Sequence, residues 1–284
     1  LAGIKCIMMN ESHAGTEKAK GIRKLFKKSL LKFFSAGFVG GTPQINHFVD
    51  LGMPKNKLFI GYDAIDNDYF IEKSDLIRLK SEEIRNQFGL PQHYILNLGR
   101  MIKKKNLSFL IESYALNDSI KTSHALVLIG SGLEESNLKN LALEKGLNVK
   151  NIIAGKVPEN SANTVFFGGF RQIEENPAFY TLADVFVLPS IEEEWGLVVN
   201  EAMACKIPIL VSKYVGCAID LVIDGINGYQ FDPTDINELN ILLKDILSNK
   251  ALKESMGYKS REIIQNWSCD LFATNAINSI NAIS

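Results

Sequence analysis

Short apolar runs separated by polar segments recur along the chain from about residue 90 onward. Each run is bounded by glycine, proline or polar residues, which is typical of a buried β-strand. The runs are Tyr94–Leu98, His124–Ile129, Val165–Phe167 and Ala183–Leu188. Helical periodicity follows several of them, as in the stretch that begins at about Leu107. Because strands that alternate with helices build a parallel sheet, we predict that residues 74–267 form an α/β domain with a doubly wound parallel sheet.

The first 73 residues follow the same alternation but contain fewer elements. Their pattern predicts strands over residues 4–9, 37–39 and 57–60 and helices over residues 16–35 and 42–51. These are too few elements for a complete Rossmann-like domain. We therefore expect residues 1–73 to be the remnant of an N-terminal domain that lacks its first part. Three helices are predicted at the end of the chain, the last of them in a separate segment, residues 268–284.

An acidic cluster, Glu192 to Glu194, follows the strand that ends at Leu188. Ligands of open α/β sheets bind at the carboxyl ends of strands, and helix N-termini attract anionic and polar groups. The pattern predicts that a helix starts beneath Glu193 or Glu194 and contains Glu201. At a rise of ~1.5 Å per residue, eight helical residues separate these backbones by about 12 Å. A glycoside hydrolase pair lies only about 5 to 9.5 Å apart, so the spacing favours two ends of one extended, hydroxyl-rich ligand.

The alternative is that the acidic cluster is a solvated helix start favoured by the helix dipole, with Glu201 paired to a lysine. The residues alone leave the two interpretations open.

A basic cluster follows an earlier strand. Gly99 and Arg100 come directly after Leu98, and Lys103, Lys104 and Lys105 precede the next helix. Cations at a strand-to-helix turn add charge to the amides of the helix start, which favours a phosphate site. The alternative is a solvated lysine run. The segment His124 to Glu135 also carries glycines after a strand, but it lacks the third glycine of the dinucleotide motif and a following acidic residue, which argues against a dehydrogenase.

The segment Pro189 to Ala204 resembles the Glu-x7-Glu motif of the retaining, nucleotide-sugar-dependent glycosyltransferases of family four. Residues 205–212, 215–222 and 225–231 are similar to the same family's C-terminal domain. The resemblance implies the GT-B fold of two facing Rossmann-like domains, with residues 1–73 on the acceptor side and residues 74–267 binding the nucleotide sugar. It also implies that the final helix crosses back to the first domain. The chain departs from the family at Asn106 and Lys206, where the family usually has glycine.

The resemblance also implies roles for individual residues. Arg100, after Gly99, and Lys105 would hold the donor diphosphate, Glu201 the ribose hydroxyls and Glu193 the transferred sugar. The amides of Gly196 and Leu197 would lie nearby, and Phe170 belongs to a loop that passes close to the nucleobase in relatives. His13 falls at about the place where many relatives have a histidine near the sugar, although Glu11 fits the alignment better and a structural role for His13 is the alternative.

The expected function is that of a retaining glycosyltransferase of hexosyltransferase type. It would move a sugar from a nucleoside diphosphate sugar to a hydroxyl of a glycan or lipid-linked acceptor, as in polysaccharide biosynthesis. No cofactor or metal is expected, because the Asp66-Asn67-Asp68 triplet lies in a polar segment that we interpret as the connector between the domains. The alternatives are a non-catalytic nucleotide-sugar-binding remnant and, more remotely, a GT-B nucleotide-sugar epimerase.

The segment Lys18 to Phe34 carries a basic and an apolar face. Lys20, Lys24, Lys27 and Lys28 share one side of the predicted helix, which suits peripheral contact with an anionic membrane. The alternative is a solvated face over a buried one. With 46% hydrophobic residues and a net charge of −1, the composition offers no bias toward nucleic acid. Four cysteines without a CxxC pair predict neither a zinc site nor disulfides, and we expect a cytoplasmic location, with the inner membrane face as the place of any contact.

Overall fold

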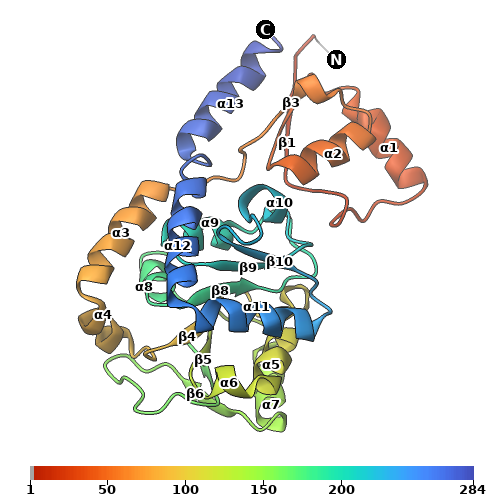
Figure 1. Ribbon diagram of the computed structural model, residues 1–284. Coiled ribbons are helices and arrows are strands. Elements are labelled where there is room, and N and C mark those ends of the chain that lie inside the picture. Colours follow the sequence, from red (N-terminus) through yellow and green to blue (C-terminus); the bar gives the residue numbers. More distant parts are fainter. Residues whose placement is uncertain (1–2) are drawn as a thin grey trace.

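The computed structural model describes residues 3–284, which form two parallel sheets with helices around them (Figure 1). The larger sheet has seven strands in the order β10-β9-β8-β4-β5-β7-β6. They are β4 (Tyr94–Leu98), β5 (Ala125–Ile129), β6 (Asn148–Asn151), β7 (Thr164–Phe167), β8 (Val185–Leu188), β9 (Ile209–Ser212) and β10 (Gly228–Phe231). The helices with them are α4 (Ser81–Phe88), α5 (Leu107–Leu116), α6 (Asp118–Lys121), α7 (Glu135–Glu144), α8 (Asn176–Thr181), α9 (Leu197–Ala204), α10 (Ala218–Leu221), α11 (Ile236–Ser248) and α12 (Lys250–Ile264). The predicted doubly wound α/β architecture is confirmed.

The central strand β4 explains why its sequence is apolar throughout. Tyr94, Leu96 and Leu98 belong to one hydrophobic cluster, which also contains Trp195. Ile95 belongs to a second cluster, on the other face of the sheet. Successive side chains of a strand point to opposite faces, and here helices cover both faces, so every position of the strand is buried.

The smaller sheet has the order β1-β2-β3 and is also parallel. Its elements are β1 (Ile7–Asn10), α1 (Ile22–Leu31), β2 (Ala36–Val39), α2 (Thr42–Asp50), the short 3-10 turn Lys55–Lys57 and β3 (Leu58–Phe59). The C-terminal helix α13 (Cys269–Asn281) packs against β2 and β3. The rings of Phe272 and Phe38 lie 5.0 Å apart, and Asn275 donates a hydrogen bond to the backbone oxygen of Ile60 at 3.0 Å. The C-terminal helix thus packs against the sheet that the first residues of the chain form.

The polar segment at Asp66 to Asp68, which follows β3 of the smaller sheet, contains the start of a helix. Helix α3 (Asn67–Leu79) begins where the Asp66 carboxylate accepts a hydrogen bond from the backbone amide of Tyr69 at 3.0 Å. It packs along α8 and α9, and residue 73 lies in its middle. Helix N-caps favour aspartate because its oxygen accepts from an otherwise unpaired amide, which accounts for Asp66 at this position.

Asn106 and Lys206 keep the turns for which the family usually has glycine. Both have a positive φ, 55° for Asn106 and 61° for Lys206. Asparagine enters this left-handed region more readily than most residues. The ammonium group of Lys206 lies 3.2 Å from the centroid of the Tyr258 ring, a cation–π contact that offsets part of the backbone cost. The two departures from the family pattern therefore leave the local backbone turns in place.

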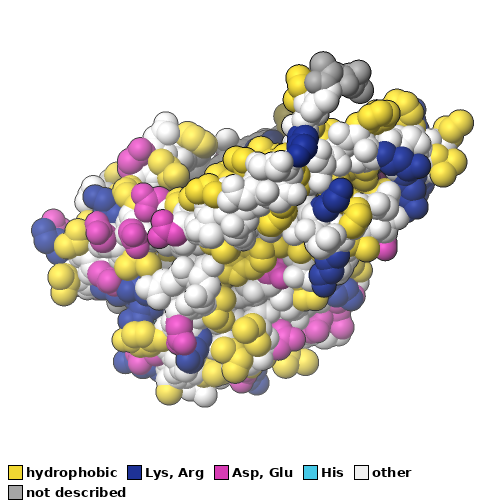
Figure 2. All heavy atoms as spheres, turned by 90° about the horizontal axis from the view of Figure 1, so that it is seen from above, with side chains coloured by type: hydrophobic (Ala, Val, Ile, Leu, Met, Phe, Trp, Pro, Cys, Tyr) yellow, Lys and Arg dark blue, Asp and Glu magenta, His cyan; other side chains and the backbone are white. Residues whose placement is uncertain are grey.

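Helix α1 is shorter than the predicted span of residues 16–35, because Gly21 precedes it with a φ of 55°. Most of the apolar side chains of α1 are exposed. This contradicts the interpretation in which the helix has a solvated basic face and a buried apolar face. Leu31 is buried, but Ile22, Leu25, Phe26 and Leu30 are exposed, as is Phe33 beyond the helix. In Figure 2, yellow and dark blue side chains lie together on the right of the face shown, where α1 lies.

None of the helices within residues 3–284 combines the length and the apolar character that crossing a membrane requires.

Candidate functional site

Two loops at the carboxyl ends of β4 and β8 bring the predicted basic and acidic clusters together. The Lys105 ammonium forms an ion pair with the Glu193 carboxylate, and both side chains are nearly buried. Ser190 donates a further hydrogen bond to Glu193 Oε2 at 3.3 Å. Beside this pair, Lys104 Nζ lies 3.0 Å from Glu194 Oε2. The clusters therefore form one charged site, in which the ammonium groups of Lys104 and Lys105 each face a carboxylate.

A hollow of about 250 Å³ opens between the ends of β4, β5 and β7. It brings together Gly99, Arg100, Phe170 and Glu201, four of the residues that the sequence singled out. Arg100 and Phe170 are exposed, whereas Glu201 is buried. The remaining lining residues are Leu98, Ile129, Gly130, Ser131, Arg171, Asn176 and Val198. A cation, an aromatic ring and a buried carboxylate thus surround one cavity, which is what an anionic ligand with a ring and hydroxyl groups requires.

Glu201 is held by two side chains that the sequence analysis did not assign to the site. Tyr180 donates a hydrogen bond to Glu201 Oε2 at 2.8 Å, and Asn176 Nδ2 lies 3.5 Å from the same oxygen. Burial raises the pKa of Glu201 to about 7, although both hydrogen bonds oppose that shift. The alternative that Glu201 pairs with a lysine is therefore wrong. Asn176 precedes a proline at the start of α8. This sequence signal predicts a helix start at Asn176, but it does not predict the contact with Glu201.

The prediction that the helix starts at Glu193 or Glu194 is also wrong. Helix α9 begins at Leu197, after Gly196, whose φ is 104°. Trp195 is buried, and its ring nitrogen donates a hydrogen bond to Asn200 Oδ1 at 3.1 Å. The side chain of Trp195 requires the chain to turn inward before the helix begins, so Glu193 lies in a loop. The helical rise consequently does not measure the separation of Glu193 and Glu201.

Gly196 and Leu197 stand at the N-terminus of α9, next to the charged site but outside the residues that line the hollow. Leu197 is 40% exposed. The backbone oxygen of Gly196 accepts a hydrogen bond from the amide of Val199 at 2.8 Å, within the first turn. The Leu197 amide is one of the first amides of the helix, which have no partner within it. That end of α9 can therefore donate hydrogen bonds to a ligand near Glu193.

His13 reaches the same loop from the smaller sheet. Its Nε2 lies 2.9 Å from the backbone oxygen of Glu193. The amide of Gly15 donates to His13 Nδ1 at 3.2 Å, so Nε2 carries the proton and donates to Glu193. Both ring nitrogens have a partner and the side chain is buried. In this geometry His13 positions the Glu193 loop.

Two further contacts between the parts of the chain that carry the two sheets were not predicted. Gln44 Nε2 donates to the backbone oxygen of Glu194 at 2.7 Å. The Thr42 amide donates to Asp220 Oδ2 at 2.8 Å. Asp63 is buried, and this burial, with the charge of Glu11, raises its pKa to about 7. The sequence feature that marks this close packing is the glycine pair before Thr42. A β-carbon on Gly41 would lie 2.7 Å from Trp195 Cζ3, so the contact requires glycine.

Comparison with known proteins identifies a family that the chain matches. The model of the family Glycosyl transferases group 1 matches residues 80–163 and 159–263. The capsular polysaccharide biosynthesis glycosyltransferase CapM of Staphylococcus aureus is 23% identical over 75% of this chain and 52% of its own length. A GDP-mannose-dependent phosphatidylinositol monomannoside mannosyltransferase of Mycolicibacterium smegmatis is 26% identical over 72% of this chain and 51% of its own length. The chain thus spans about half the length of these curated relatives.

Solved structures show the same fold. Anabaena Alr3699/HepE, in complex with UDP and glucose, matches with a TM-score of 0.72 and 20% identity over 99% of this chain and 72% of that one. A glycosyltransferase from Rickettsia africae matches with a TM-score of 0.77 and 16% identity over 98% of this chain and 70% of that one. At such identities the likeness establishes the architecture of both sheets. The chain belongs to the glycosyl transferases group 1 family and has the GT-B fold.

Proposed function

We propose that the protein transfers a sugar from a nucleoside diphosphate sugar to a hydroxyl of a glycan or lipid-linked acceptor, with retention of configuration and as a hexosyltransferase. The observation that carries the proposal is the hollow in which buried Glu201 and exposed Arg100 and Phe170 lie together. The HepE structure with UDP and glucose supports a donor of this class, as does the name of the GDP-mannose-dependent relative. The name of the capsular polysaccharide relative supports a glycan product.

The cations act on the leaving group. As the glycosidic bond breaks, negative charge grows on the diphosphate, and fixed cations stabilise that charge most when it is fully developed. Arg100 is exposed at the hollow, and Lys105 lies nearly buried in the adjoining loop. Charge-assisted hydrogen bonds from these groups are stronger than neutral ones. The mechanism therefore needs no metal on the diphosphate, and transfer should persist in chelator.

The hollow holds the nucleoside. Glu201 accepts hydrogen bonds from the two ribose hydroxyls, because a carboxylate offers several acceptor positions to a vicinal diol. Tyr180 orients the carboxylate from behind. The exposed ring of Phe170 offers the base an apolar surface at the mouth of the hollow.

Glu193 holds the transferred sugar. When the diphosphate engages Lys105, the Glu193 carboxylate loses its ion-pair partner and accepts hydrogen bonds from sugar hydroxyls. The amides of Gly196 and Leu197 donate nearby. The acceptor hydroxyl attacks from the face that the diphosphate leaves, and a phosphate oxygen takes the hydroxyl proton. The sugar–phosphate bond breaks as the new glycosidic bond forms, so configuration is retained.

A transfer assay with the natural full-length protein tests the proposal. Arg100→Ala and Glu193→Ala should each lower transfer by about 100-fold or more, as expected when a charged group acting on the transition state is removed. Lys103→Ala, an exposed neighbour, is the matched control and should keep its rate. Nucleoside diphosphate binding without transfer would favour the non-catalytic alternative. Conversion of the donor to its epimer without acceptor would favour the epimerase.

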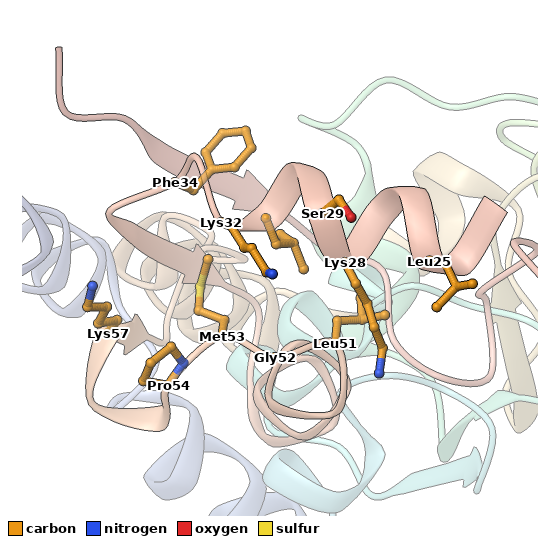
Figure 3. A pocket seen from close by; sticks show the side chains of 11 residues that line it. Leu25, Lys28, Ser29, Lys32, Phe34, Leu51, Gly52, Met53, Pro54 and Lys57 are labelled. Atoms are coloured by element: carbon orange, nitrogen blue, oxygen red, sulfur yellow. The ribbon is translucent and has the colours of Figure 1, made fainter. Parts of the chain in front are cut away.

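We further propose that α1 contacts an anionic membrane, where a lipid-linked acceptor would be met. The support is a basic helix whose apolar side chains are exposed: Ile22 is 82% and Phe26 66% exposed. A neighbouring hollow of about 560 Å³ is lined by Lys28, Lys32 and Lys57 among apolar residues (Figure 3). A helix that lies at a membrane interface has two parts. Its lysines approach the lipid phosphates, and its apolar side chains enter the boundary of the acyl chains.

A further inference from the structure

Three side chains of the kind that bind metal ions meet at the edge of the large sheet opposite the hollow. His93, His124 and Asp184 each stand one residue before a strand, namely β4, β5 and β8. These strands are neighbours in the sheet, with β4 in the centre. Because the strands are parallel, their first residues lie along one edge, while the hollow lies at their carboxyl ends. The cluster is therefore separate from the site described above.

The three side chains are close enough to share an ion. One ligand atom from each lies within 4.8 Å of the other two. His93 Nδ1 is 3.3 Å and His124 Nε2 is 3.8 Å from Asp184 Oδ2. Ligands at ~2.0 to 2.1 Å from a tetrahedral zinc ion lie about 3.3 Å from one another. The two distances from the imidazoles to Asp184 are thus within about half an ångström of the spacing that zinc requires.

The surroundings hold two of the ligands in place. The Asp184 carboxylate is buried and accepts a hydrogen bond from the Tyr94 amide at 3.0 Å, and Lys253 binds its other oxygen. Ser123 Oγ lies 2.8 Å from His124 Nδ1, which leaves Nε2 to face Asp184. A partner on the second ring nitrogen is the usual support of a metal-binding histidine. His93 has a half-exposed side chain, so an ion can enter from solvent.

We propose that His93, His124 and Asp184 bind a divalent transition-metal ion of the zinc class. Two imidazoles and one carboxylate are borderline and hard ligands that suit zinc, and three protein ligands leave one position for water. The ion links the starts of three adjacent strands and so stabilises the large domain. It takes no part in sugar transfer. The sequence prediction of no metal rested on the cysteines and the acidic triplet, neither of which belongs to this cluster.

Lys253 sets how tightly the ion binds. Its ammonium already neutralises Asp184, and a cation next to the ion repels it. Lys253→Met removes the competing charge and should tighten binding. A merely structural ion pair would show no such gain in metal affinity.

The test is titration of chelator-treated protein with Zn²⁺ in a calorimeter, and with Co²⁺ in a spectrophotometer, where tetrahedral coordination gives visible absorption. We expect saturable binding of a single ion per chain and a rise in melting temperature. His93→Ala and His124→Ala should each weaken binding by about tenfold or more. His47→Ala, which removes a histidine near a different carboxylate, Glu17, is the control and should bind as the parent does.

Nucleoside diphosphate binding, measured in parallel, separates this proposal from the proposed function, because the two sites are independent. Failure to bind Zn²⁺ and Co²⁺, or equal affinity in the parent and both histidine variants, would overturn the metal site. His93 is half-exposed, so the His93→Ala variant should fold as the parent does and keeps the test valid if His124→Ala does not.

Discussion

The ammonium of Lys105 lies against the carboxylate of Glu193, although 88 residues separate them in the chain. Each residue belongs to a loop at the carboxyl end of a different strand, and the strands, β4 and β8, are neighbours. The pair is nearly buried, so breaking it without a substitute partner leaves a charge uncompensated. A ligand with a diphosphate and sugar hydroxyls supplies a partner to both groups.

This pairing predicts opposite effects on diphosphate binding for two variants. Lys105→Ala should weaken nucleoside diphosphate binding by about 10- to 100-fold, the loss of one charge-assisted hydrogen bond. Glu193→Gln should bind the diphosphate at least as tightly as the parent, because Lys105 no longer has a competing carboxylate, yet it should lose transfer. Isothermal titration measures nucleoside diphosphate binding by the two variants, and a transfer assay measures their activity. Weakening of similar size in the two variants would show that the ion pair serves only to hold the loops together.

Glu201 should make stability depend on pH. Its pKa is about 7 in the fold against an ordinary 4.5, so between these values the folded state holds a proton that the unfolded state has released. Stability is therefore lost as pH rises through this range. Glu201→Gln removes the dependence and should gain about 2 to 3 kcal/mol relative to the parent on going from about pH 4 to about pH 8.

Urea unfolding of both proteins at several pH values measures this gain. Asp63, with a pKa also raised to about 7, contributes the same slope to both proteins, and it cancels in the difference. A difference that stays constant with pH would mean that the pKa of Glu201 is the same in the folded and unfolded states.

Gly41 should tolerate no side chain. A β-carbon there would meet the carboxylate of Asp220 and lie 2.7 Å from Trp195 Cζ3. Gly41→Ala should therefore cost about 1 to 3 kcal/mol of stability, as overpacking does, and loosen the contact between the two sheets. The control is Asn46→Ala, on the exposed side of helix α2, which begins directly after Gly41. It should change stability by less than about 0.5 kcal/mol. Chemical denaturation compares them, and equal stabilities would show that Asp220 and Trp195 can move to accommodate a β-carbon at Gly41.

The surface of α1 should bind anionic vesicles. Replacing Lys20, which precedes α1, and Lys24, Lys27 and Lys28 within it with glutamine should weaken binding to vesicles containing phosphatidylserine, at about 1 kcal/mol for each lysine near the surface. Lys27 forms an ion pair with Glu17 and should contribute least. A control that replaces Lys80, Lys244, Lys250 and Lys259 changes the net charge equally at exposed sites elsewhere. A sedimentation assay reads both. If the two quadruple variants bind alike, the attraction is a property of total charge and α1 is not a docking surface.

Much of the site was predictable because its signals are local. Arg100 follows a strand and a glycine, and Glu201 lies in the apolar helix that follows another strand, so assigning each residue to its loop or helix needed only periodicity. The start of α9 was not predictable in the same way. It depends on the burial of Trp195, which is decided by residues distant in the chain.

The sequence by itself determined the alternation of strands and helices, and through it the doubly wound sheet, because hydrophobic period reflects which faces of each element are buried. It also determined the residue types at the strand ends. Only the tertiary structure decided which of these residues meet. The pairing of Lys105 with Glu193 and the grouping of two histidines with Asp184 follow from the order of strands in the larger sheet. The support of Glu201 by Tyr180 follows from the packing of α8 against α9. The exposed apolar side of α1 depends on which elements pack around that helix. The order of strands places distant segments side by side, and no local pattern encodes it.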